Sequence, residues 1–145
     1  MTSKTKLAIA KKWIIDNSNQ ILNGNEQMLE VGILSTELRA DPTAKNLGLS
    51  LGSRHEVKPQ LFFVSKDSKG NMHIGIAEVS EKPLNLTSLG VMQVYARMVE
   101  PRYAIILCEK SMSKELLELR ANPSISKRLF NYSNYGEIQL YDVIF

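Results

Sequence analysis

The sequence predicts an α/β protein, close to the α+β class, in which a mixed sheet of about five strands is packed with helices. Three features of the 145 residues lead to this prediction. Segments with an apolar period of two alternate with segments whose apolar period is near 3.6. In the middle of the chain, two strand-like segments flank a short polar turn, as in a hairpin. After them, strands and helices take turns, as in strand–helix–strand crossovers.

The first 38 residues are predicted to form two helices. Over residues 4–22, apolar side chains recur at roughly helical spacing. Asn23 and its neighbours interrupt the pattern, and Asn23 with Glu26 has the spacing of a capping box. A second helix is therefore expected over residues 23–38, and Pro42 is expected to keep it from continuing.

Residues 42–59 are predicted to be a loop, with one short strand at 47–51, where leucine alternates with glycine and serine. Residues 60–80 are predicted to form the hairpin, because QLFFV and MHIGIAEVS flank the turn-forming segment SKDSKGN. In the returning strand, alternation places Glu78 and Ser80 on the same face as two isoleucines. Glu78 is thus a charged residue at the end of an isoleucine-rich face.

After Pro83 the apolar residues again recur at helical spacing. The expected elements are a helix capped by Thr87 or Ser88 and continuing to 99, a buried strand at 102–108, a helix capped by Ser113, a helical piece at 125–132 and a strand at 137–145. One domain of residues 1–145 follows, with N-terminal helices in residues 4–38 and a mixed-sheet core in residues 46–145.

Composition limits the classes of partner and compartment. The net charge is +3 and the isoelectric point about 9.0, which permits a polyanionic partner. No apolar run approaches the roughly 18 residues of a membrane span, so no membrane partner is expected. The N-terminus lacks the long apolar segment of a signal peptide, and Cys108 is the single cysteine, which rules out an internal disulfide. We therefore expect a cytoplasmic protein.

Four polar residues follow one another along the chain in the same order as the motif residues of a known protein family. Glu30 lies in a predicted helix, Pro59-Gln60 begins a strand, Glu78 lies in the next strand, and Gln93 lies in the following helix. This pattern resembles the PD-(D/E)XK, or restriction-endonuclease-like, nuclease superfamily. The resemblance implies candidate catalytic residues Glu30, Gln60, Glu78 and Gln93, with Glu78 as a metal ligand and Mg²⁺ as cofactor if the site is active.

Two departures from the family pattern bear on the chemistry. Gln60 stands where the family has Asp, and Ser80 stands where it has Lys. Mg²⁺ prefers hard, charged oxygen ligands, and serine cannot replace the positive charge of a lysine. The resemblance then implies a nuclease-like scaffold that has lost, or never had, cleavage activity, and for such a scaffold no cofactor is expected. The alternative interpretation is that Glu78 is only the polar end of a strand face.

The candidate phosphate contacts are the basic residues that flank these positions. Arg54, His55 and Lys58 follow the glycine-containing segment NLGLSLG, and Lys82 follows the second strand of the hairpin. These residues either contact phosphates or belong to an ordinary surface loop. The sequence lacks a P-loop, a Rossmann fingerprint and the spacing of a zinc site.

The first functional hypothesis is a nucleic-acid-binding protein, for DNA or RNA, on a nuclease-like scaffold without cleavage activity. One alternative is a metal-dependent nuclease that uses Glu30 and Glu78. Another is a protein-interaction or assembly module. Trp13 either anchors the first helix to the core or forms a homodimer contact.

Overall fold

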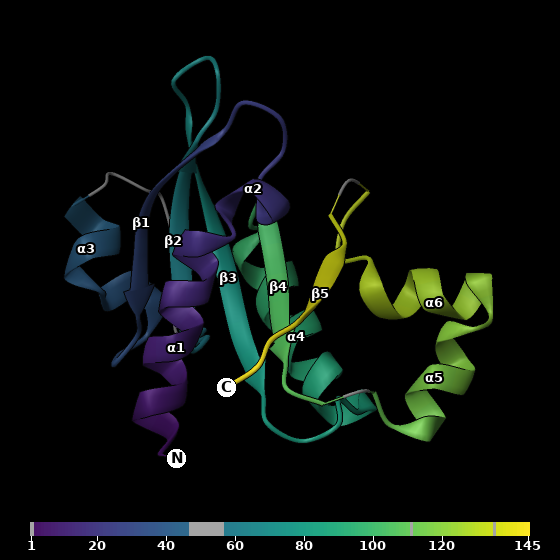
Figure 1. Cartoon of the computed structure of the whole chain (residues 1–145). Coiled ribbons are helices and arrows are strands. Elements are labelled where there is room, and N and C mark those ends of the chain that lie inside the picture. Colours follow the sequence, from purple (N-terminus) through teal and green to yellow (C-terminus); the bar gives the residue numbers. More distant parts are fainter. Residues whose placement is uncertain (1, 47–56, 111, 135) are drawn as a thin grey trace.

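The computed structural model describes residues 2–46, 57–110, 112–134 and 136–145, which form one five-stranded mixed sheet (Figure 1). The strands, which lie side by side in chain order, are β1 (Gln27–Ile33), β2 (Leu61–Lys66), β3 (Met72–Ser80), β4 (Tyr103–Cys108) and β5 (Ile138–Asp142). The pairs β1–β2 and β2–β3 are antiparallel, whereas the pairs β3–β4 and β4–β5 are parallel. The predicted fold class is confirmed.

Helices cover both faces of this sheet. They are α1 (Ser3–Asp16), α2 (Ser18–Ile21), the 3₁₀ turn η1 (Leu38–Ala40), α3 (Pro42–Asn46), α4 (Leu86–Val99), α5 (Lys114–Arg120) and α6 (Pro123–Phe130). In Figure 1, α1 lies in front of the sheet and α4 behind it, so the layers are helix, sheet and helix. Within the described ranges, every helix is too short or too polar to cross a membrane.

Each face of the sheet has its own apolar core. Phe62 and Phe63 are adjacent in β2 and therefore point to opposite faces. Phe62 belongs to the cluster shared with α4, and Phe63 belongs to the cluster shared with α1. Trp13 is partly buried against the second cluster, and its ring lies 5.4 Å from that of Tyr141. This contact anchors α1 to the last strand.

The predicted hairpin and the two crossovers are present. Residues of β2 and β3 pair in antiparallel register from Leu61 opposite Ala77 to Lys66 opposite Met72. The turn between them contains Gly70 at φ 87°, a backbone conformation that favours glycine. Helix α4 then connects β3 to its parallel neighbour β4, and α5 with α6 connects β4 to β5.

The helix predicted over residues 23–38 is wrong, because this segment contains β1, and the sheet therefore begins before residue 46. Gly24 adopts φ 48° in a tight turn, and Glu26 accepts from Arg102 instead of completing a capping box. The apolar spacing was misleading because the strand has a register irregularity between Met28 and Glu30, which breaks the period of two.

Two smaller predictions are also corrected. Asp41 and Pro42 begin a helix rather than end one, since the Asp41 carboxylate accepts from the backbone N–H of Ala44 at 3.0 Å. The cap of α4 is Asn85, whose side chain accepts from the N–H of Ser88. The strand predicted at 47–51 lies outside the described residues.

Candidate functional site

Glu78 lies near the carboxyl end of β3, on the face that packs against α4. Ile74 and Ile76 precede it on this face and belong to the cluster shared with α4, whereas Ala77 belongs to the opposite cluster. Glu78 itself is half-buried and pairs in register with Ile106 of β4. The alternation predicted for this strand is therefore confirmed.

Hydrogen bonds connect Gln60 with Glu78 and Val79 across the open end of the β2–β3 hairpin. The backbone N–H of Gln60 donates to Glu78 Oε2 at 3.3 Å. In return, the Gln60 side-chain oxygen accepts from the backbone N–H of Val79 at 2.6 Å. The Gln60 carbonyl group also accepts from the N–H of Leu34, which follows β1. Gln60 thus fixes the position of Glu78 between three segments of the chain.

Burial makes the Glu78 carboxyl group a much weaker acid than usual. Desolvation raises its pKa from 4.5 to about 7, and the hydrogen bond from the Gln60 N–H opposes this change only in part. Glu78 is the one ionisable residue among those that line the adjacent pocket within the described chain. The carboxyl group therefore changes its charge near neutral pH.

A pocket of about 350 Å³ opens beside Glu78, between the carboxyl ends of β3 and β4 and the start of α4. It is lined by Gln60, Glu78, Val79, Ser80, Leu84, Ser88, Val91 and Ile106. Crevices at the carboxyl ends of parallel strands are common ligand sites in α/β proteins. The Ser80 hydroxyl group donates to the Lys82 carbonyl oxygen at 2.8 Å and so helps to turn the chain away from the sheet.

Glu30 does not join Glu78 in this pocket. It is exposed on β1, where it pairs in register with Val64, and it lines a separate hollow of about 610 Å³ between α1, α2 and β1. Glu78 lies opposite Gln60, four positions along β2 from Val64 and one strand further. At about 3.3 Å per residue and 4.8 Å per strand, the Cα atoms of Glu30 and Glu78 are well over 10 Å apart.

Gln93 also has other partners. Its Nε2 donates to the carbonyl oxygens of Leu129 at 2.5 Å and Asn131 at 3.1 Å, and its Oε1 accepts from Arg97. These bonds tie α4 to the end of α6. The structure thus brings together two of the four residues implied by the resemblance, Gln60 and Glu78, and keeps Glu30 and Gln93 elsewhere.

The pocket beside Glu78 supplies few protein ligands for Mg²⁺. The pocket offers one carboxyl group, and the Gln60 oxygen already accepts from Val79. Mg²⁺ is usually bound through one or two carboxylates together with waters and substrate phosphates, and Glu78 is the one carboxylate among the residues that line this pocket. Across the described ranges, no group of three His, Cys, Asp or Glu side chains could hold a metal ion.

Two of the four predicted phosphate contacts can be placed. Lys58 precedes β2 and Lys82 follows β3; both are exposed, and neither has an ion-pair partner among the described residues. Because β2 and β3 are antiparallel, these lysines lie at the same end of the hairpin as Gln60 and Glu78. Arg54 and His55 lie outside the described residues.

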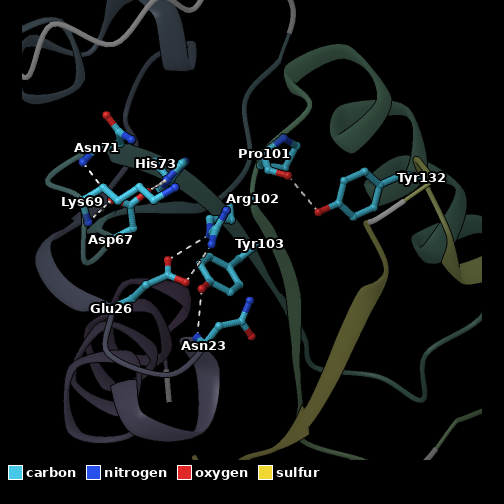
Figure 2. A network of polar contacts seen from close by, with 10 residues as sticks. All are labelled: Asn23, Glu26, Asp67, Lys69, Asn71, His73, Pro101, Arg102, Tyr103 and Tyr132. Carbon is cyan, nitrogen blue, oxygen red and sulfur yellow. Dashed lines mark hydrogen bonds and ion pairs between the residues drawn. The ribbon is translucent and has the colours of Figure 1, made fainter.

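A polar network at the other end of the sheet was missed by sequence reasoning. Figure 2 shows Glu26 paired with Arg102 through two hydrogen bonds, of 2.9 and 3.0 Å. At the turn end of the hairpin, His73 Nε2 lies 2.8 Å from Asp67 Oδ2. This bond, together with those from the backbone N–H groups of Asn71 and Lys69, lowers the pKa of Asp67 to about 2. The Glu26–Arg102 pair connects the segments that precede β1 and β4, and the Asp67–His73 bond closes the hairpin turn. Glu26 and Arg102 are 76 positions apart, so no local pattern could reveal their pairing.

Comparison with known proteins gives one structural similarity to report. No protein-family model matches the chain, and no curated protein matches it. The solved structure of EndoMS in apo form is similar to this chain, with a TM-score of 0.46 and 13% sequence identity. The similarity covers 99% of this chain and 47% of the EndoMS chain, so this chain spans about half of the length of EndoMS. Membership of the PD-(D/E)XK superfamily stays a prediction.

Proposed function

We propose that this chain binds nucleic acid, with DNA as the first candidate, and does not cut it. The observation that carries the proposal is the arrangement at the open end of the β2–β3 hairpin. Exposed Lys58 and Lys82 flank Glu78 there without an acidic partner among the described residues. Lysine side chains at such positions can neutralise phosphates and release their counterions.

Two features reduce the negative charge around the hairpin end. Glu81, next to Lys82, lies 3.6 Å from Lys6, and Lys6 also contacts Glu109 at 3.1 Å. Glu78 is partly protonated at neutral pH because burial raises its pKa to about 7. The nearby acids therefore repel a phosphate backbone less than their number suggests.

The absence of cleavage is proposed from the chemistry of Gln60 and Ser80. Metal-dependent hydrolysis of a phosphodiester needs charged groups that bind the metal and neutralise the developing phosphate charge. Gln60 is neutral and its oxygen is used by Val79, and the hydroxyl group of Ser80 bonds to a backbone carbonyl. The alternative, a nuclease that uses Glu30 and Glu78, needs two carboxylates that lie on different strands and line different hollows.

The experiment that tests this function uses one labelled DNA duplex and two readouts. Binding is measured by fluorescence anisotropy, and the length of the duplex is measured after incubation with Mg²⁺ or Mn²⁺. We expect the duplex to be bound and to stay intact. Binding without cleavage separates the proposal from the nuclease alternative, and failure to bind favours the interaction-module alternative.

A double variant shows whether the two neutral residues limit catalysis. Gln60→Asp with Ser80→Lys introduces a second carboxylate beside Glu78 and a cation on the same strand face, so metal-dependent cleavage is expected to rise above that of the unaltered protein. Adding Glu78→Ala should abolish any activity gained. Robust cleavage by the unaltered protein that is lost in Glu78→Ala would contradict the proposal.

A further inference from the structure

The pocket beside Glu78 has the size and the lining of a binding site for a small molecule. Its volume of about 350 Å³ lies at the lower end of the range for such sites. Apolar side chains form much of its wall. Leu84 and Ile106 are buried members of the core shared with α4, and Val91, on α4, is 44% exposed. The pocket therefore has an apolar interior and an opening to solvent beside α4.

Backbone hydrogen bonds to other segments fix the wall of the pocket. The carbonyl oxygen of Leu84 accepts from the N–H of Ser113 at 2.9 Å, and that of Ser80 accepts from the N–H of Glu109 at 3.1 Å. Gln60 is bonded to Glu78 and Val79, as described above. A site whose wall is ordered before a ligand arrives loses less conformational entropy on binding.

Polar groups in the pocket keep unused hydrogen-bonding capacity. Glu78 Oε2 accepts from the N–H of Gln60, whereas Glu78 Oε1 has no hydrogen-bond partner among the described residues. The hydroxyl group of Ser88, in the first turn of α4, also has no such partner in the described part of the chain. Two hydrogen-bond acceptors in one small pocket can meet a ligand with more than one N–H group.

Glu78 is a half-buried acid without a positive partner in the described ranges. The causes of its raised pKa are burial and the smaller, opposing effect of the Gln60 N–H, and no charged side chain is among them. The charged side chains on the segments that flank the pocket are Lys58, Glu81, Lys82 and Glu109. An unpaired carboxylate is costly to bury, and a cation beside it offsets much of that cost. The ligand that complements this pocket is therefore positively charged.

We propose that the pocket binds a small organic cation in which an amidinium or guanidinium group is joined to a short apolar body. The N–H groups of the cation donate to Glu78 Oε1 and to the hydroxyl oxygen of Ser88. The apolar body packs between Leu84, Val91 and Ile106. A planar cation with several N–H groups in fixed positions suits these two acceptors better than an ammonium group, which is a compact point charge.

Benzamidine and benzamide test the charge of the ligand, because they have nearly the same shape and only benzamidine is positively charged. Each is titrated into the unaltered protein at pH 8, and the backbone amide NMR signals of Val79 and Ser88 are followed. We expect benzamidine to bind with a Kd of about 1 mM or lower, as for other ligands of its size. Benzamide should bind at least about tenfold more weakly. Equal affinities, or no change in these signals at about 20 mM benzamidine, would overturn the proposal.

Glu78→Gln tests the carboxylate. Glutamine keeps the shape of the side chain and removes its charge, so the Kd for benzamidine should rise at least about tenfold. The matched control is Glu30→Gln, which removes an exposed acid that lines a different hollow and should leave the Kd unchanged. Equal losses in the two variants would show that benzamidine responds to the overall charge of the protein, which would contradict the proposal.

Val91→Trp tests the location without a change of charge. Val91 lies on the exposed side of α4 and lines the pocket, so a tryptophan there fills the opening without entering the core. The Kd for benzamidine should rise at least about tenfold, because the indole ring and the ligand cannot occupy the same space. Val94→Trp is the matched control, since Val94 is 55% exposed on the same helix and does not line the pocket. Equal effects of the two tryptophans would overturn the proposal.

These measurements are independent of the proposed function. Benzamidine carries no phosphate, and none of the variants changes Lys58 or Lys82. A pocket that does not bind benzamidine leaves the binding of DNA by these lysines untouched, and a protein that does not bind DNA can still bind the cation.

Discussion

Glu78→Gln is expected to stabilise the protein by about 3 kcal/mol at pH 8 and to change its stability little at pH 4. In the folded protein, burial raises the pKa of Glu78 from 4.5 to about 7. The stability contributed by the neutral carboxyl group is therefore complete below about pH 4.5 and is lost as the pH rises through about 7. Glutamine mimics the neutral form at every pH and can still accept from the Gln60 N–H.

Thermal denaturation at several pH values measures this effect. A difference of about 3 kcal/mol corresponds to roughly 10 °C in Tm for a chain of this size. The control is Glu30→Gln, which removes an exposed carboxylate and should change stability by less than about 0.5 kcal/mol at either pH. A Glu78→Gln variant whose Tm differs from that of the unaltered protein by the same amount at pH 4 and pH 8 would show that the Glu78 pocket does not favour the neutral acid.

Gly75→Ala is expected to cost about 1 to 3 kcal/mol or more, because it overpacks the core. A Cβ at Gly75 would overlap the ring of Phe63, which is fully buried and lies opposite Gly75 in the hairpin. Urea denaturation measures the loss. Gly90→Ala is the matched control, since its new methyl group meets open space and should slightly stabilise helix α4. If Gly75→Ala proved as well tolerated as Gly90→Ala, the register of β2 and β3 would be different from the one described.

The parts of the fold that were predicted correctly are those marked by apolar spacing or turn residues within a short stretch of the sequence. The β2–β3 hairpin was recognisable because two alternating segments flank a turn with Asp67 and Gly70. Strand β1 was missed because its irregularity near Glu30 makes the apolar spacing resemble a helix. Its identity as a strand comes from pairing with β2, which begins 28 residues after β1 ends, and no local propensity records such pairing.

The candidate site was predictable in part for the same reason. Alternation in β3 placed Glu78 and Ser80 on the face of two isoleucines, and Pro59-Gln60 marked the start of β2. The exchange of hydrogen bonds between Gln60 and Glu78 depends on the register of the two strands, and the raised pKa depends on burial beneath α4. Gln93 had the position expected of a site residue, but the packing of α6 gives it two carbonyl partners instead.

The most direct test of nucleic-acid binding at the hairpin end is a salt titration of duplex binding. If about three to five phosphates are neutralised, the slope of log K against log salt should be roughly −3 to −4.5, and Lys58→Ala with Lys82→Ala should flatten it by up to about two units. Lys66→Ala with Lys69→Ala removes the same charge at the turn end of the same hairpin and should leave the slope nearly unchanged. No binding to DNA or RNA at about 50 mM salt, or equal losses in the two double variants, would contradict binding at this end of the hairpin.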